Sequence, residues 1–195
     1  MGKVFLDMSM SLDGFIAGPK DDDNPDRELE ALESLHDWMF SGKTEREAEE
    51  WQEAYFTTIG AIIMGRRTFD LGVGPWGDNP TFHATCFVLT KDARDKLVKQ
   101  GGTTYTFVTD GIESALEKAQ TAAGNKDIRV LGGANAAQQY LKAGLLDEIQ
   151  IYLVPVLLGE GIRLFEHLGS EFVELERTQV IEAPGVTQLT FRVVK

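Results

Sequence analysis

The feature that most constrains the fold of this chain is the alternation of short apolar, β-branched runs with helical segments. Helices are predicted at Ile112–Ala123, at Ala134–Ala143 and after the capping-box signal Thr44-x-x-Glu47. The last two runs have no helix between them, and Ala183-Pro184-Gly185 predicts a hairpin turn there. The apolar runs predict strands near Lys3–Asp7, Ile59–Met64, Thr85–Leu89, Tyr105–Val108, Asp127–Leu131, Glu148–Val154, Phe172–Val180 and Val186–Val194.

Strands that alternate with helices are typical of a mostly parallel sheet covered on both faces. We therefore expect one α/β domain over residues 1–195, with a mostly parallel central sheet and a C-terminal antiparallel hairpin. The acidic stretch Pro19–Glu33 is interpreted as a loop that leads into an exposed helix.

Charge and composition exclude some classes of binding partner. A formal net charge of −12 argues against nucleic acid, because basic surfaces bind phosphate backbones. No apolar run approaches the roughly 20 residues that span a bilayer, and the N-terminal segment lacks the pattern of a secretory signal. Cys86 is the single cysteine, which excludes an internal disulfide. We expect a cytoplasmic protein with a small-molecule substrate and with neither a nucleic-acid nor a membrane partner.

Several patterns are weak as functional motifs. Gly72–Gly77 reads G-x-G-x-x-G, but a helical segment precedes it and Pro75 follows, whereas the dinucleotide fingerprint lies between a strand and a helix. The three histidines have no metal-ligand spacing, so no metal site is expected. The motifs of α/β-hydrolases and P-loop proteins are missing.

The segment Gly65-Arg66-Arg67-Thr68 follows a predicted strand and begins a predicted helix. Free amides at a helix start, the helix dipole and two guanidinium groups together favour a phosphate. The alternative is a pair of solvated surface arginines. Thr90 and Lys91 follow another strand end and are candidates to contact the same anion, although a threonine–lysine pair there is also an ordinary turn.

A second candidate anion site lies at Gly132-Gly133, between a predicted strand and the helix that starts near Ala134. Glycines leave room for a pyrophosphate, and the helix start supplies amide donors. A plain strand-to-helix turn is the alternative. One site for a 2′-phosphate and one for a diphosphate would together describe NADPH.

Four segments in this order resemble the dihydrofolate reductase-like fold. They are Met10–Pro19 (MSLDGFIAGP), residues 62–70 (IIMGRRTFD), Phe87–Lys91 (FVLTK) and residues 130–165, which begin VLGGANAAQQYL. The S-L-D-G-x-I-A start and the P-V-L-L-G-x-G-x-x-L-F end most resemble the reductase domain of the bifunctional deaminase-reductase of bacterial riboflavin biosynthesis and its stand-alone relatives. The resemblance covers nearly the whole chain and implies a three-layer fold, NADPH-dependent hydride transfer and a homodimer, for which the apolar segment IQIYLVPVLL is a candidate contact surface.

The resemblance also assigns residues. Ile16 and Ala17, in a loop after the first strand, would border the nicotinamide. The adenosine 2′-phosphate and its neighbouring phosphate would be held by Gly65, Arg66, Arg67 and Thr68, with Thr90 and Lys91 beside them. The diphosphate would lie at Leu131, Gly132, Gly133, Ala134 and Asn135.

The substrate side is less determined by the sequence. In folate reductases an acidic residue on the helix before the M-G-R strand contacts the pterin. Counting back the same number of residues from Gly65, without gaps, reaches Glu49. Glu49 lies in an acidic run, which is also typical of a solvated helix face. Asp7 is the other candidate for this polar contact, and Tyr152 is a candidate to face the substrate cleft. With one cysteine and without the H-x-E and P-C-x-x-C motifs, we do not expect the zinc deaminase half of the riboflavin enzyme. The insertion before that helix is expected to reshape the substrate side, so the substrate of either related family does not carry over directly to this chain. The leading hypothesis is reduction of an aminopyrimidine ribosyl group; dihydrofolate reduction and a nucleotide-binding module without turnover are the alternatives.

Overall fold

The computed structural model describes residues 2–19, 26–40, 55–170 and 172–195. Within these ranges nine strands form one sheet in the order β10-β11-β8-β1-β7-β3-β4-β6-β5, and β2 pairs with β9 in a small second sheet. The strands are β1 (Val4–Ser11), β2 (Phe15–Ala17), β3 (Ile59–Gly65), β4 (Thr85–Leu89), β5 (Leu97–Val98), β6 (Thr104–Val108), β7 (Asp127–Val130), β8 (Glu148–Val154), β9 (Ile162–Arg163), β10 (Leu175–Ala183) and β11 (Val186–Val193).

The centre of the large sheet is parallel, from β8 through β1, β7, β3 and β4 to β6. Antiparallel strands close both edges, because β11 pairs with β8, β10 pairs with β11, and β5 pairs with β6. This arrangement confirms the expected α/β fold with a mostly parallel sheet and a C-terminal hairpin. The hairpin turns at Pro184-Gly185, as predicted, with Gly185 at a φ of 76°.

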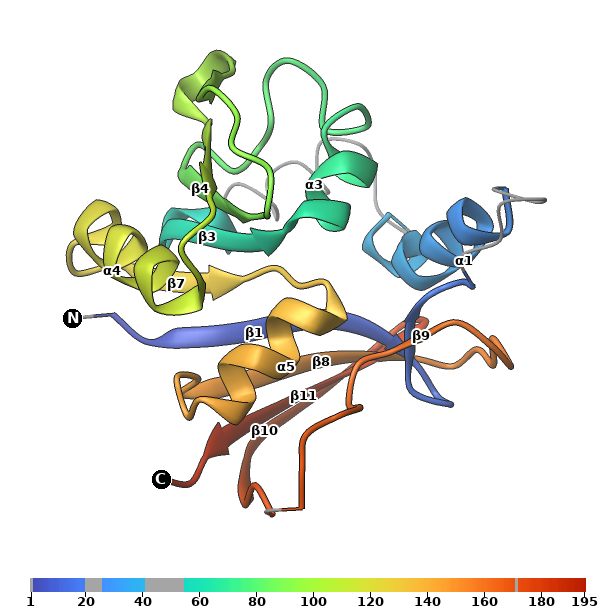
Figure 1. Ribbon diagram of the computed structural model, residues 1–195. Coiled ribbons are helices and arrows are strands. Elements are labelled where there is room, and N and C mark those ends of the chain that lie inside the picture. Colours follow the sequence, from blue (N-terminus) through green and yellow to red (C-terminus); the bar gives the residue numbers. More distant parts are fainter. Residues whose placement is uncertain (1, 20–25, 41–54, 171) are drawn as a thin grey trace.

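Helices cover both faces of the sheet, which gives three layers (Figure 1). On one face α4 (Ile112–Ala123) and α5 (Ala134–Lys142) pack against the alternate strand residues that include Leu6 and Ile63. On the other face Phe69 of α3 (Arg66–Gly72) packs with Ile62, and α1 (Asp26–His36) contributes Leu35 to a cluster with Tyr152. The 3-10 turns are η1 (Asp37–Met39) and η2 (Gln100–Gly102). The strict inside–outside alternation of strand side chains explains how β3 serves two cores at once.

Most element bounds agree with the sequence prediction to within a few residues, and three points differ. The segment before Leu175 is not a strand, so the predicted Phe172–Val180 strand is shifted towards the C-terminus. The short strands β2, β5 and β9 were not predicted, so Ile16 and Ala17 lie in a strand rather than a loop. Helix α1 is not simply exposed, because Glu28, Ala31 and Leu35 are buried.

The loop Ser11–Gly14 is fixed by hydrogen bonds to the segment before β9. The Asp13 carboxylate accepts from the backbone N–H groups of Leu158 (3.2 Å) and Gly159 (2.8 Å), and Ser11 Oγ donates to it at 2.6 Å. These hydrogen bonds, that of Ser11 first, hold the pKa of Asp13 below its usual range. The S-L-D-G and L-L-G-E-G motifs, far apart in sequence, therefore bind each other and fix β2 beside β9.

None of the helices in the described ranges has the length and the apolar character needed to cross a bilayer.

Candidate functional site

The two glycine-containing segments predicted to bind phosphates lie side by side at the C-terminal edge of the parallel sheet. Strands β3 and β7 are neighbours, with Ile63 opposite Val130, so both end at the same level. Just beyond, the Gly65 N–H donates to the Gly132 carbonyl oxygen at 2.6 Å. We call residues Gly65–Thr68 and Leu131–Asn135 together the strand-end corner. Ligands of open α/β sheets bind at this edge.

The two sides of the strand-end corner approach closely, and glycines at the contact leave its small space unfilled. A Cβ placed on Gly133 would lie 3.3 Å from Oγ1 of Thr68, and one placed on Gly65 would lie 3.5 Å from the Gly133 nitrogen. Gly132 has a φ of 90°, a left-handed conformation that side chains disfavour. Gly133 is the N-cap of α5 and offers no side-chain cap, so the first amides of α5, from the buried Ala134 and the exposed Asn135, have no capping acceptor. The corner is therefore open to a close-fitting anion.

The two arginines of the corner have different partners. Arg66 Nε donates to both carboxylate oxygens of Asp70, at 2.8 and 2.7 Å. Its Nη1 is buried and has no hydrogen-bond partner among the described residues, although the Asp92 carboxylate lies 3.8 Å away. Arg67 instead donates from Nε (2.9 Å) and from Nη2 to the carboxylate of Glu28 on α1. The sequence did not predict that carboxylates neutralise this cationic pair.

Thr90 and Lys91 follow β4, the strand next to β3. The Thr90 N–H donates to the Val108 carbonyl at 3.0 Å, and its Oγ1 accepts from the Asp92 N–H at 3.1 Å. Lys91 is exposed. Strand order therefore places these residues at the same sheet edge as Gly65, which ends β3 opposite Leu89 of β4.

The strand-end corner has groups that suit phosphate oxygens. Arg66 Nη1 is buried and makes no hydrogen bond to the described residues, with the Asp92 carboxylate 3.8 Å away, and a buried donor without a hydrogen bond is costly unless a ligand satisfies it. The glycines on the β7 side provide a cradle that a Cβ would narrow. Diphosphate oxygens suit such amide-lined turns.

Ile16 and Ala17 are buried in β2, where β9 packs closely against them. A Cβ on Gly161 would meet the Ala17 carbonyl oxygen at 2.2 Å, so this contact requires a glycine.

Asp7 lies in a buried polar cluster on the sheet face that α1 and η1 cover. Its Oδ1 accepts from Arg129 Nη2 at 2.5 Å, and its Oδ2 accepts from the Tyr55 hydroxyl at 2.6 Å. Asp7 is 3% exposed, and the Arg129 guanidinium also lies 5.2 Å from the Tyr55 ring and 5.5 Å from the Phe56 ring. Burial acts to lower the pKa of Arg129, but the Asp7 carboxylate together with Tyr55 and Tyr152 acts in the opposite direction, and the pKa is raised overall. Burial raises the pKa of Tyr55 far above its usual range.

Tyr152 lies beside this cluster, next to Ser9 in the β1–β8 register. Its ring stacks on Trp38 with centroids 4.6 Å apart, and Trp38 Nε1 donates to Ser9 Oγ at 3.3 Å. Burial first, and then the Asp7 carboxylate, raise the pKa of the Tyr152 phenol. The structure places Asp7 and Tyr152, the two residues predicted separately to contact substrate, in one cluster where both are buried. Glu49 lies outside the described residues.

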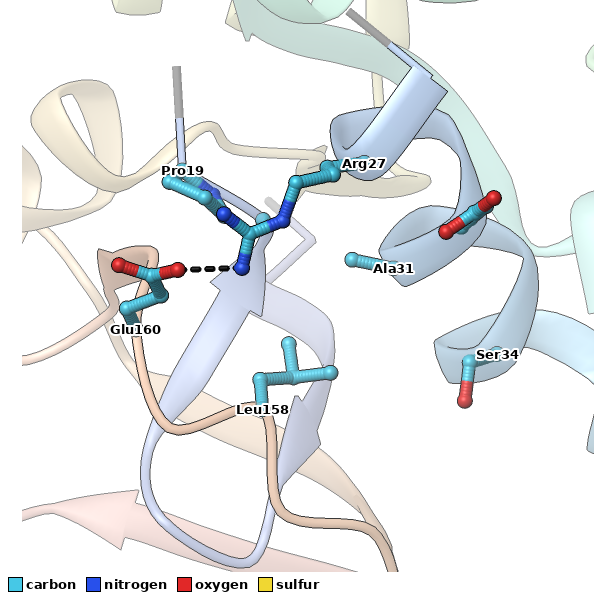
Figure 2. Close-up of a pocket in the computed structure, with 8 residues that line it drawn as sticks. Pro19, Arg27, Ala31, Ser34, Leu158 and Glu160 are labelled. Atoms are coloured by element: carbon cyan, nitrogen blue, oxygen red, sulfur yellow. Dashed lines mark hydrogen bonds and ion pairs between the residues drawn. The ribbon is translucent and has the colours of Figure 1, made fainter. Parts of the chain in front are cut away.

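A pocket of about 220 Å³ opens between α1 and the loop before β9. Figure 2 shows Arg27 of α1 paired with Glu160 across it, with Ala31, Ser34 and Leu158 along its wall. Gly18 and Pro19, which follow β2, form its remaining edge with Glu30. None of the residues predicted from the sequence to bind coenzyme or substrate lines this pocket.

Comparison with known proteins identifies the family. A family model described as the RibD C-terminal domain matches residues 2–188. The chain belongs to the RibD C-terminal domain family.

Similar proteins support this assignment at the level of the fold. A Shewanella sp. PV-4 protein assigned to riboflavin biosynthesis superimposes with a TM-score of 0.74 at 24% identity, over 99% of each chain. The Thermotoga maritima diaminohydroxyphosphoribosylaminopyrimidine deaminase/5-amino-6-(5-phosphoribosylamino)uracil reductase superimposes with a TM-score of 0.62 at 13% identity, over 99% of this chain and 57% of that one. In sequence, Bacillus subtilis (strain 168) YwjB, named an uncharacterized protein, is 28% identical over 177 residues, 87% of this chain and 86% of YwjB.

Several residues of this RibD C-terminal domain were not predicted as site residues, namely Glu28, Tyr55 and Arg129. The signal for Arg129 was present, since it is a charge inside the apolar strand run Asp127–Leu131. Glu28 carried no signal, because it is one of many acids in an acidic stretch.

Proposed function

We propose that this RibD C-terminal domain is an NADPH-dependent reductase of a pyrimidine- or pterin-like compound. Reduction of the ribosyl group of an aminopyrimidine to ribityl, the type of reaction named for the Thermotoga maritima relative, is the leading specific reaction. The family assignment supports a reductase. The observation that supports NADPH as the coenzyme is the strand-end corner. There the hydrogen bond from the Gly65 N–H to the Gly132 carbonyl oxygen brings the arginines at the start of α3 beside the glycine turn before α5.

Each part of the chain has a task in this proposal. Arg66 and Thr68, with Thr90 and Lys91 beside them, would hold the 2′-phosphate end, and Gly132, Gly133 and the first amides of α5 would hold the diphosphate. Ile16 and Ala17 would border the nicotinamide and exclude water from it, because both are buried. NADPH supplies the hydride when bound, so the protein need only align the donor with the substrate carbon.

Thermal stabilisation tests the coenzyme. At a hundred times its dissociation constant a ligand adds about 2.7 kcal/mol, or about 5–11 °C in Tm for a chain of this size. We expect this shift with NADPH and a smaller one with NADH. In R66Q the Tm shifts with NADPH and NADH should become equal. R177Q, at an exposed arginine on the distant strand β10, should keep the larger shift with NADPH. Equal shifts with both coenzymes in the wild-type protein would contradict the proposal.

Absorbance of NADPH tests the substrate. Oxidation with the phosphoribosylaminouracil and not with dihydrofolate supports the leading reaction, and the reverse result supports dihydrofolate reduction. Coenzyme binding without oxidation by either compound would identify a binding module.

We also propose a homodimer. Strand β8, from the segment predicted as the contact surface, lies inside the sheet with Ile149 and Ile151 buried, so these two side chains are not available for a contact, whereas Leu157 later in the segment is exposed. The edge strand β10 carries three exposed apolar side chains, Leu175, Val180 and Ile181, and is the alternative contact surface that we propose. A second copy of the chain bound at this edge would cover the exposed backbone and side chains of β10.

A further inference from the structure

The Arg67–Glu28 pair is unusual for a surface arginine because its carboxylate partner is buried. The Arg67 side chain is 42% exposed, whereas that of Glu28 is only 10% exposed. Two guanidinium nitrogens bind the two carboxylate oxygens, which is the bidentate geometry with the highest specificity. A phosphate that took Arg67 away would leave the Glu28 charge buried without this partner, which is unfavourable.

Arg66 differs from Arg67 because its carboxylate partners are exposed rather than buried. Its hydrogen-bonded partner Asp70, on the same helix, is 47% exposed, and Asp92, whose carboxylate lies 3.8 Å from Nη1, is 81% exposed, so water can solvate both carboxylates. Its Nη1 remains buried without a hydrogen-bond acceptor among the described residues. Of the two neighbouring arginines, Arg66 therefore has the donor that a phosphate would satisfy at the smaller cost.

Glu28 belongs to a helix turn that is attached to the nicotinamide side of the predicted site. A Cβ on Gly18, one residue after β2, would lie 2.8 Å from the Arg27 carbonyl oxygen and 3.1 Å from the Glu28 Cα, so α1 packs directly on this backbone. The neighbouring Arg27 pairs with Glu160 in the loop before β9 (Figure 2). The first turn of α1 thus connects the end of β2, the loop before β9 and, through Arg67, the strand-end corner.

We propose that Glu28 is a positioning residue that withdraws Arg67 from phosphate binding and uses it to hold α1 against the strand-end corner. Selection of NADPH over NADH then rests on Arg66. This inference rests on the proposed function for its coenzyme part, and it revises the prediction that both arginines bind the 2′-phosphate.

The coenzyme part is tested by the ratio of the dissociation constants of NADH and NADPH, measured by titration calorimetry. R66Q should lower this ratio by about tenfold or more, as expected when a charge-assisted hydrogen bond is lost. R67Q should change it by less than about threefold. A loss with R67Q as large as that with R66Q would overturn the inference.

The positioning part is tested without coenzyme, by amide hydrogen exchange over residues 27–36. E28Q and R67Q should each increase exchange there, and the double variant should add little, because both changes break one contact. E33Q, at an exposed glutamate of the same helix, and R66Q should match the wild type. Unchanged exchange in E28Q and R67Q would overturn the positioning role. If the wild-type protein binds neither coenzyme, the proposed function and the coenzyme part fail together, and exchange still decides the positioning role.

Discussion

Replacement of Asp7 by asparagine tests whether this residue is structural or catalytic. Asp7 and Arg129 form an ion pair with side chains 3% and 8% exposed, and Tyr55 donates to the second carboxylate oxygen. D7N preserves the size of the side chain but removes its charge. The guanidinium of Arg129 then remains buried without a counter-charge, and its Nε already has no hydrogen-bond partner among the described residues.

The size of the effect follows from burial. Breaking a buried ion pair by changing one partner costs about 3–5 kcal/mol of the free energy of unfolding. For a chain of this length each kcal/mol lowers Tm by about 2–4 °C, so we expect D7N to lower Tm by about 6–20 °C. D95N, at an exposed aspartate, should stay within about 0.5 kcal/mol of the wild type.

Urea denaturation followed by circular dichroism measures the free energy of unfolding of D7N, D95N and the double variant D7L/R129M. The double variant should recover much of the loss, since apolar residues can replace a buried ion pair at little cost. A D7N protein within about 1 kcal/mol of the wild type, but without turnover, would refute this reasoning. Asp7 would then act as an acid that faces the substrate, as one interpretation of the sequence suggested.

Three further predictions concern pH, the glycine turn and assembly. Burial holds the pKa of His36 below its ordinary value of 6.5, so the contribution of the neutral imidazole to the free energy of unfolding is complete above pH 6.5 and is lost as pH falls towards the folded pKa. H36Q should flatten this part of a stability–pH curve, and an unchanged curve would contradict the assignment. Gly132→Ala should cost about 1–3 kcal/mol because of its φ of 90°, whereas Gly133→Ala, at a φ of −69°, should mainly weaken NADPH binding; equal unfolding energies in denaturant would contradict this. V180E should shift a dimer to monomer in analytical ultracentrifugation, and E176Q on the same strand should not; a V180E dimer would exclude this edge.

The proximity of the two glycine-containing segments could be predicted from the sequence, because it depends on local patterns. Gly65 and Gly132 each end an apolar strand run and begin a helix, and parallel strand ends share one edge, so their proximity followed from periodicity and topology. The same reasoning did not reach the partners of the arginines. Glu28 is 39 residues from Arg67, in an acidic stretch that offers several carboxylates, and no local pattern distinguishes the one that pairs with Arg67.

The sequence by itself determined the order of the longer strands and of the helices between them, the hairpin at Pro184-Gly185, and the position of Gly65 and Gly132 at strand ends, because apolar periodicity and turn residues act over short windows. Tertiary structure alone decided that Asp7 pairs with Arg129, 122 residues away, and that α1 is half-buried. Those outcomes depend on which sheet face a helix covers and on the desolvation of charges that packing encloses, and no local pattern specifies either.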